Sequence, residues 1–244
     1  MIIGKNTSQR VEKNLLKQMR IIGKIDSISF RSENFEQLFT SEDYIIEIVK
    51  SIGVFLPSLW KETFKKPLTK SIIEAKILHT STGLTIALKR YNRSPKMQTL
   101  DIAGLCGYDD KSELLNDFLE SHFLEFMECE LKRIDVCFDF VKVPNRIIKR
   151  LCEKREPFKF RNTTYYKTAK EKKINDTLDI KRYDKQKEAK LPEPLERIEF
   201  CFKGAYFKGM KLKELDKNFL VKMEKTILNF SGINAKIASI SYIV

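Results

Sequence analysis

Alternation of apolar and polar residues is the most frequent pattern along the chain, and such alternation predicts strands. In the first half, the predicted strands span residues 24–30, 71–78, 84–91 and 98–102. In the second half, they span residues 130–140, 158–167, 178–184, 195–202 and 235–244. Thr82 and Gly83 separate two of these segments and predict the turn of a hairpin.

Apolar residues at helical spacing are found in fewer segments. The clearest helix covers residues 111–127, where Leu114, Leu115, Phe118 and Phe123 line one face. Further helices are predicted over residues 8–22, 42–52, 144–153 and 212–229. Helices that alternate with runs of strands predict an α+β fold on an antiparallel sheet, with helices packed mainly on one face. We expect one domain over residues 1–244.

Charge is the unusual feature of the composition. The chain has 46 lysines and arginines against 33 acidic residues, a formal net charge of +13. Residues 141–190 alone hold 17 of the basic residues and seven acids. Such an excess favours a polyanionic partner, because each phosphate that a cation neutralises releases condensed counterions. A solvated, lysine-rich loop is the alternative interpretation.

Hydropathy and cysteine usage exclude other classes of protein. No apolar run approaches the ~20 residues that a membrane-spanning helix needs, so no membrane partner is expected. None of the five cysteines lies at CxxC spacing, which argues against a zinc site or a disulfide framework. We therefore expect a cytoplasmic protein.

Acidic residues occupy strand positions between large apolar side chains. In residues 133–140, alternation places Asp135 and Asp139 on one face, and residues 196–202 place Glu199 likewise beside Arg197. If these strands pair, Asp135 and Glu199 can meet, and carboxylate oxygens suit Mg²⁺ or Mn²⁺. Asp139 lies roughly 13 Å beyond Asp135 along an extended strand. Cross-strand salt bridges with Arg133 and Arg197 are the alternative.

Tyrosines within the basic region offer a nucleophile. Tyr165 and Tyr166 lie in one predicted strand, and Tyr183 lies in the next. A phenol that attacks a phosphodiester forms a covalent phosphotyrosine, which preserves the bond energy for rejoining. The developing charge then needs a cation or a metal ion. Tyrosines that merely pack or contact DNA would give the same pattern.

In their order, these motifs resemble the replication initiation factor family, which comprises initiators of rolling-circle plasmids and phages and related relaxases of conjugative elements. The resemblance covers roughly residues 96–204. The motifs that carry it are Asp101-Ile-Ala-Gly-Leu-Cys-Gly107, Arg133-Ile-Asp-Val-Cys-Phe-Asp139, Thr164-Tyr-Tyr-Lys-Thr168, Arg182-Tyr-Asp-Lys185 and Arg197-Ile-Glu199.

The resemblance implies an HUH-like, or more broadly ferredoxin-like, sheet and an endonuclease and strand transferase. It implies that Asp135, Asp139 and Glu199 hold a divalent metal ion, Mg²⁺ or Mn²⁺. A tyrosine would attack the origin strand and leave a 5′-phosphotyrosine link and a free 3′-hydroxyl. Tyr166 is the first choice of nucleophile, with Tyr165 as its neighbour and Tyr183 in a supporting role that could be exchanged with it.

The partner that the resemblance implies is origin DNA, single-stranded or in a cruciform. Residues 1–60 would form an N-terminal helical portion that binds DNA, and Lys185 would lie near the phosphate. A homodimer is compatible with the resemblance, and so is a host helicase, since the chain has no GxxxxGK[ST] loop of its own. The residues expected to bind DNA are Arg161, Lys167, Lys170, Lys172, Lys173, Lys181 and Arg182.

The sequence also departs from the family pattern. Lys167, Thr168 and Ala169 stand where glycine and serine commonly follow the strand tyrosine. The only two histidines, His79 and His122, are far apart, so a His-hydrophobic-His metal motif is impossible. Two other functions stay open. One is an origin-binding protein without enzymatic activity, and the other is an RNA-binding or RNA-processing protein on a ferredoxin-like sheet.

Overall fold

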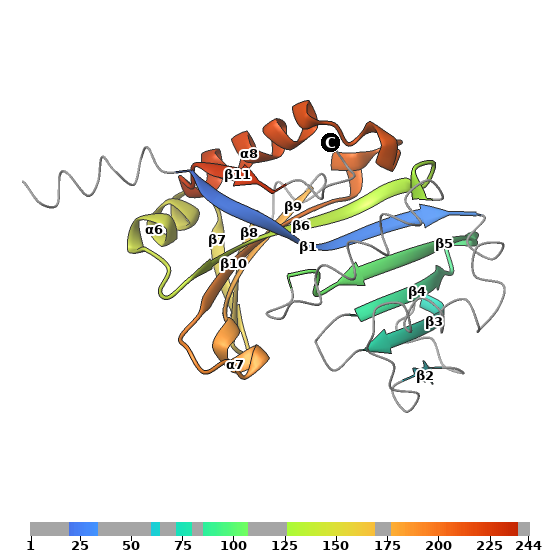
Figure 1. Cartoon of the computed structure of the whole chain (residues 1–244), viewed down its shortest axis with the longest axis horizontal. Coiled ribbons are helices and arrows are strands. Elements are labelled where there is room, and N and C mark those ends of the chain that lie inside the picture. Colours follow the sequence, from blue (N-terminus) through green and yellow to red (C-terminus); the bar gives the residue numbers. More distant parts are fainter. Residues whose placement is uncertain are drawn as a thin grey trace, which may run out of the picture.

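The computed structural model describes residues 20–33, 60–63, 72–79, 85–106, 126–168 and 177–238. Its centre is one sheet in the order β2-β3-β4-β5-β1-β6-β10-β9-β8-β7 (Figure 1). Neighbouring strands in this order are antiparallel, and β11 pairs with β1 in parallel. The fold is therefore α+β, as the sequence predicts.

The sheet is built from strands of very different length. They are β1 (Ile21–Ser32), β2 (Trp60–Thr63), β3 (Ile72–His79), β4 (Thr85–Tyr91), β5 (Ser94–Ala103), β6 (Glu130–Phe140), β7 (Glu156–Phe160), β8 (Thr163–Lys167), β9 (Leu178–Asp184), β10 (Glu196–Lys203) and β11 (Ala235–Ile237). The helices are α6 (Asn145–Lys154), α7 (Lys185–Ala189) and α8 (Lys217–Ser231), with short 3-10 helices η3 (Gly204–Phe207) and η4 (Leu212–Glu214). Within the described ranges, no helix has the length and apolar character of a membrane span.

One face of the central strands forms the hydrophobic core. Strand alternation directs Val136 and Phe138 of β6 to the same side as Phe200 of β10, and all three are at most 1% exposed. The rings of Phe138 and Phe200 meet edge to face at 5.9 Å. Helices α6 and α8 contribute Leu151 and Met223 to this core, so both helices cover the same face of the sheet (Figure 1).

Strand β1 lies between β5 and β6 and passes very close to the core at Gly23. A Cβ atom at this position would lie 2.7 Å from the ring of Phe138 and 2.9 Å from Val136. No real Cβ contact is that short, so glycine lets β1 approach β6 here.

Most of the predicted elements are confirmed, with ends that differ by a few residues. This holds for the strands over residues 24–30, 71–78, 84–91, 98–102, 130–140, 178–184 and 195–202, and for the helix over residues 144–153. The strand over residues 235–244 is described only as β11. The helix over residues 42–52 and nearly all of that over residues 111–127 lie outside the described residues.

Three of the predicted segments have a different structure from the one expected. The predicted strand over residues 158–167 is a hairpin of β7 and β8, whose turn places Arg161 at a left-handed φ of 52°. An arginine there gives no turn signal, since glycine and asparagine favour that conformation. The helical pattern over residues 212–229 divides into η4 and α8, because Asp216 accepts a hydrogen bond from the Phe219 amide and caps a new helix. Residues 21 and 22, predicted as helical, begin β1.

Candidate active site

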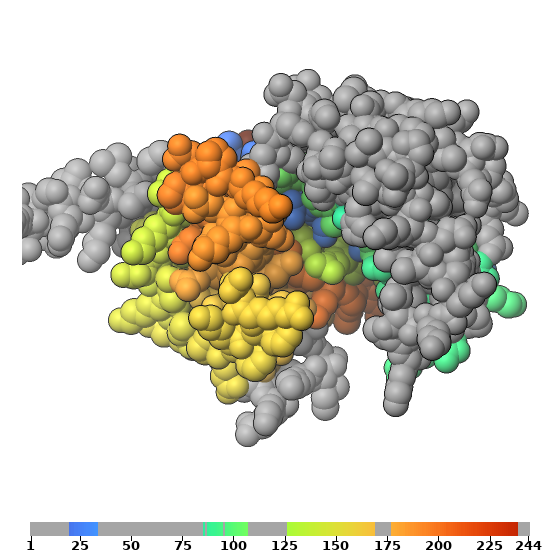
Figure 2. Space-filling view, turned by 90° about the horizontal axis from the view of Figure 1, so that it is seen from below, coloured from blue at the N-terminus to red at the C-terminus, as the bar shows by residue number. Residues whose placement is uncertain are grey.

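The face of the sheet opposite α6 and α8 carries two buried acids at its centre, Asp135 of β6 and Glu199 of β10. Asp135 pairs with Cys201 and Glu199 with Cys137, so the acids are diagonal neighbours on one face. Each is 2% exposed, and their carboxyl groups share a hydrogen bond. We call these two residues the carboxylate pair. Seen from the side opposite α8, yellow and orange residues of β7 to α7 border a recess in which β6 appears in green (Figure 2).

Each member of the carboxylate pair has a cationic partner. Arg133 Nε donates to Asp135 Oδ1 at 2.7 Å, and its Nη2 donates to the other oxygen. Lys181 Nζ lies 2.6 Å from Glu199 Oε1. Burial alone would raise the pKa of Asp135, but the hydrogen bond and charge of Arg133 hold this pKa below its usual value. Burial raises the pKa of Glu199 to about 7, against the pull of Lys181 and with the help of the Asp135 charge. Glu199 can therefore exchange a proton near neutral pH.

Tyr183 of β9 completes this group. Its hydroxyl donates a hydrogen bond to Glu199 Oε2 at 3.0 Å. Burial and the negative charge of Glu199 both raise the pKa of Tyr183, so the phenol keeps its proton until a base accepts it. The ammonium groups of Lys181 and Lys185 lie 5.7 Å and 5.9 Å from the centre of the Tyr183 ring. A phenol, a base and two cations thus converge at one point of the sheet.

Asp139 belongs to a separate group on the same face. Arg197, which pairs with Asp139 across β6 and β10, donates to both of its oxygens at 2.7 Å and 2.8 Å. The same guanidinium lies 3.1 Å from Asp26 Oδ1 of β1, and Arg197 itself is 0% exposed. We call Asp26, Asp139 and Arg197 the arginine cluster. The three acids expected to share one metal ion are therefore divided between two groups, because Asp139 is held by its own arginine.

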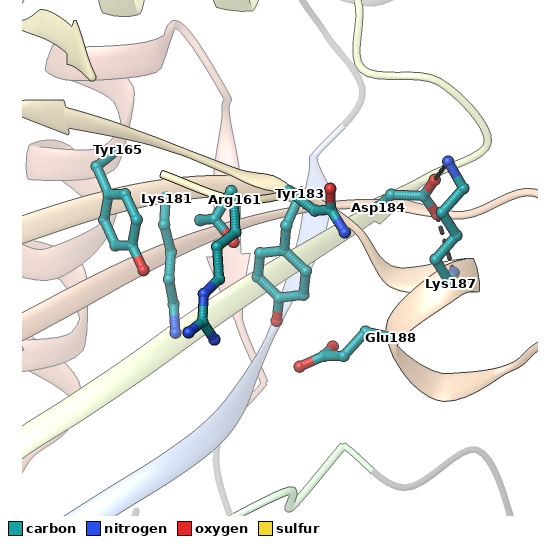
Figure 3. Close-up of a pocket in the computed structure, with 9 residues that line it drawn as sticks. Arg161, Tyr165, Lys181, Tyr183, Asp184, Lys187 and Glu188 are labelled. Carbon is teal, nitrogen blue, oxygen red and sulfur yellow. Dashed lines mark hydrogen bonds and ion pairs between the residues drawn. The ribbon is translucent and has the colours of Figure 1, made fainter. Parts of the chain in front are cut away.

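The two neighbouring tyrosines of β8 point to opposite faces. Tyr166 pairs with Ile180, is 2% exposed and belongs to the hydrophobic core. In that position its hydroxyl cannot meet a phosphate on the polar face, so the geometry does not fit Tyr166 as the nucleophile. Tyr165 pairs with Lys181 and lies on the polar face. In Figure 3, the side chains of Tyr165, Lys181, Arg161 and Tyr183 point to the same side of the sheet.

Two clefts open onto this group. One, of about 400 Å³, is lined by Arg161, Tyr165, Lys181, Tyr183 and Glu188, among others. The second, of about 340 Å³, borders the carboxylate pair and Tyr183 and extends to β4 and β5. Glu188 of α7 reaches toward the Tyr183 ring in Figure 3 and pairs with Lys185 at 2.7 Å. Sequence patterns gave no reason to select Glu188, because it lies in a five-residue helix without a repeating pattern.

The basic residues expected to bind DNA are also divided between the two faces of the sheet. Arg161 lies in the β7–β8 turn, and Lys167 and Lys181 lie on the polar face. Arg182 pairs with Ile198, so it lies on the opposite face of β9. The expected DNA contacts Lys170, Lys172 and Lys173 lie outside the described residues.

A third group of possible metal ligands was not predicted from the sequence. The side chains of Asp26, Cys106 and Cys137 place one donor atom each within 4.8 Å of one another, and the two sulfur atoms are 3.4 Å apart. These residues are far apart in the chain, so no spacing rule could select them. Thiolates favour softer metals than the oxygen ligands of the carboxylate pair do.

Comparison with known proteins gives a loose structural similarity and no similarity in sequence. No protein-family model matches the sequence, and no curated protein sequence is significantly similar to it. Among solved structures, the chain is similar to a rolling circle replication initiator protein from Geobacillus stearothermophilus, with a TM-score of 0.42 and 11% identity over 84% of each chain. A likeness of this size does not assign a function, which has to be argued from the residues themselves.

The donor set of the carboxylate pair suits a hard divalent cation. Asp135 and Glu199 offer buried carboxylate oxygens on neighbouring strands, and one shared proton reduces their repulsion. A cation could replace that proton. Asp139 is not part of this pair, since Asp135 and Glu199 are hydrogen-bonded to each other whereas Asp139 is bound to Arg197. A cation at the pair would have to displace Arg133 from Asp135, because Arg133 donates to both of its oxygens. A site for Mg²⁺ or Mn²⁺ at the carboxylate pair would therefore have two protein carboxylates rather than three.

Proposed function

We propose that this protein initiates rolling-circle replication by nicking and rejoining one strand of origin DNA, with Tyr183 as the nucleophile. The observation that carries the proposal is the 3.0 Å hydrogen bond from the Tyr183 hydroxyl to Glu199, a carboxylate whose pKa burial raises to about 7. A base with such a pKa accepts the phenol proton effectively at neutral pH. Tyr165 is the second candidate, because it lies on the same face beside Lys181.

Proton transfer in this proposal runs through Glu199. As the Tyr183 oxygen forms its bond to phosphorus, the phenol proton passes to Glu199 Oε2. The bond from phosphorus to the 3′-oxygen breaks, and Glu199 returns the proton to that oxygen, which becomes a free 3′-hydroxyl. The 5′-phosphate stays linked to Tyr183, so the reverse sequence rejoins the strand.

Cations around Tyr183 would hold the scissile phosphate. Lys181 and Lys185 flank the Tyr183 ring, and Arg161 points into the same cleft (Figure 3). Positive groups fixed in place before the reaction stabilise the charge that develops on the phosphate oxygens. Asp135 and Glu199 are the residues that would hold Mg²⁺ or Mn²⁺, which acts as a Lewis acid on a phosphate oxygen when bound.

The ion pairs favour a second candidate function. Arg133 and Lys181 already neutralise the carboxylate pair, an arrangement that also suits a purely structural role in a protein that binds origin DNA without cutting it. In that case the Tyr183 hydroxyl would only satisfy a buried carboxylate.

A two-label cleavage assay separates the two candidates. The protein is incubated with Mn²⁺ and origin DNA that carries different fluorophores on its 5′ and 3′ sides. We expect the 3′ label to become covalently attached to the protein, and the released 5′ fragment to be extendable by a polymerase. Mass spectrometry then identifies the attached residue. Binding of the intact DNA without any adduct would support the non-enzymatic candidate.

Matched tyrosine variants identify the nucleophile. Tyr183→Phe should lower adduct formation by at least about 10²-fold, the scale on which positioned catalytic groups act. Tyr166→Phe removes a buried hydroxyl on the other face and should leave the adduct yield within about twofold, as expected for changes away from the reacting atoms. If Tyr165→Phe abolishes the adduct while Tyr183→Phe does not, Tyr165 is the nucleophile.

A further inference from the structure

Exposed aromatic side chains mark the outer edge of the sheet. All five residues of β7 are exposed, and β7 ends the order of paired strands. Within it, Phe158 is 48% and Phe160 is 55% exposed. They are the only aromatic residues among the large hydrophobic side chains found exposed in the described ranges. Two neighbouring exposed rings at a sheet edge are costly in water, so a ligand that covers them is expected.

The register of the strands places these rings on the same face as the candidate nucleophile. Phe158 pairs with Tyr165, which pairs with Lys181, which pairs with Glu199. Directly paired residues share a face, so this row leads from the edge ring to the base. A parallel row leads from Phe160 through Thr163 to Tyr183. Two strand spacings separate Phe160 from Tyr183, roughly 10 Å.

Cations accompany each ring. Lys167 Nζ lies 4.5 Å from the centre of the Phe158 ring and 6.0 Å from that of Tyr165. The Arg161 guanidinium carbon lies 5.4 Å from the centre of the Phe160 ring. A cavity of about 580 Å³ lies against this surface, lined by Phe158, Phe160, Tyr165 and Lys167, and also by Lys203. A positively charged group therefore lies within 6.0 Å of the centre of each of the three rings.

We propose that Phe158, Phe160 and Tyr165 form a stacking platform that binds unpaired bases of single-stranded DNA next to the scissile phosphate. Bases within a duplex stack on one another and offer no free ring face, whereas an unpaired base can stack on an aromatic side chain. The basic residues among the rings match a polyanion rather than an apolar partner. The platform deepens the function proposed above, since it would lead a melted origin strand across β8 toward Tyr183.

The test measures DNA binding without cleavage. Tyr183→Phe protein, without divalent metal ions, is titrated against a fluorescent oligothymidine, a duplex, and an abasic oligonucleotide of the same length. We expect the oligothymidine to bind more tightly than the abasic strand, because only the former offers bases to stack. Because Tyr183→Phe protein cannot nick by the proposed route, this result does not depend on the nicking activity.

Platform variants then show whether the rings supply the difference. Phe158→Leu and Phe160→Leu keep an apolar side chain without a π face, and each should weaken oligothymidine binding by roughly tenfold. Binding of the abasic strand should change little. Leu228→Ala, an exposed apolar residue of α8, is the matched control and should have no effect. Lys167→Ala should instead reduce the salt dependence of binding by about 0.7 in the logarithmic slope.

Three outcomes would overturn the proposal. The first is equal binding of oligothymidine and abasic strands, and the second is unchanged oligothymidine binding by the platform variants. The third is that Phe158→Leu changes the molecular mass of the protein measured by light scattering without weakening DNA binding. That result would indicate that this edge contacts a second copy of the chain. Loss of oligothymidine binding by the platform variants would support the platform whether or not the unsubstituted protein forms an adduct. If the unsubstituted protein forms none, only the proposed nicking is contradicted.

Discussion

The carboxylate pair and the arginine cluster lie on the same face of the same strands, yet their charges are arranged differently. In the arginine cluster, one buried guanidinium serves two carboxylates, and Asp139 has both oxygens satisfied. In the carboxylate pair, two acids share a proton, and the outer oxygen of Glu199 accepts a hydrogen bond from Tyr183. The first arrangement is a buried ion-paired group, whereas in the second a carboxylate with a raised pKa lies beside a phenol. We therefore expect the arginine cluster to stabilise the sheet, and we propose that the carboxylate pair takes part in the reaction.

The largest expected effect that distinguishes the two groups is on the reaction. Glu199→Gln keeps the size of the side chain but removes the base, so adduct formation should fall by about 10²- to 10⁴-fold. Asp139→Asn, the matched change in the arginine cluster, should lower it far less. The measurement is the initial rate of adduct formation with labelled origin DNA. Equal losses for both variants would mean that the two groups act as one.

The free energy of unfolding, by contrast, should depend most on the arginine cluster. Arg197→Leu leaves the carboxylates of Asp26 and Asp139 without their buried partner, which should lower the free energy of unfolding by about 3–5 kcal/mol. Arg182→Leu, on the other face of β9, is the control and should cost much less. Urea denaturation followed by circular dichroism measures both. A loss below about 1 kcal/mol for Arg197→Leu would contradict a structural role for the arginine cluster.

Affinity for Mn²⁺ should also differ between variants of the two groups, by a smaller but more specific effect. Asp135→Asn should weaken Mn²⁺ binding at least about tenfold, since removal of even an outer partner of a metal site has an effect of that size. Asp139→Asn should leave Mn²⁺ affinity nearly unchanged, because Asp139 belongs to the arginine cluster and is not hydrogen-bonded to Glu199 as Asp135 is. Calorimetric titration of the DNA-free protein measures both affinities. Similar losses of Mn²⁺ affinity in the two variants would instead support the three-carboxylate site that the sequence predicted.

The most gradual expected effect is the change of nicking rate and stability with pH. Glu199 has a pKa of about 7, so the rate of nicking should rise about tenfold per pH unit below pH 7 and level off above it. Stability should change in the opposite direction. Because this pKa lies above the ordinary value of 4.5, the folded protein binds the extra proton, and its contribution to stability is lost as the pH rises through about 7. Glu199→Gln should flatten both profiles, and a pH dependence retained in that variant would assign the titration to another group.

The sequence carried more information about the elements than about their partners. Alternation in residues 130–140 and 195–202 correctly placed acids on one face and large apolar residues on the other, because side chains along a strand follow a fixed period. The same rule placed Tyr165 and Tyr166 on opposite faces, but only the packed helices show which face is buried. The choice of Tyr166 as nucleophile failed to fit for that reason.

Pairing between strands was decided by tertiary structure. The separation of Asp139 from Asp135 along β6 followed from strand geometry, but its partner Arg197 depended on the register of β6 with β10. Asp26 joined the same guanidinium from a strand more than a hundred residues away, and Glu188 reached the cleft from a helix too short to leave a pattern.

The sequence by itself determined that this protein has a basic, strand-rich α+β fold with acids and tyrosines on strand faces, since composition and period are local properties. Only the tertiary structure decided that Tyr183, rather than Tyr166, lies beside Glu199, and that the exposed rings of β7 share that face. These relations depend on strand register and on which face the helices cover. Both are fixed by contacts between residues far apart in the chain, which no local pattern records.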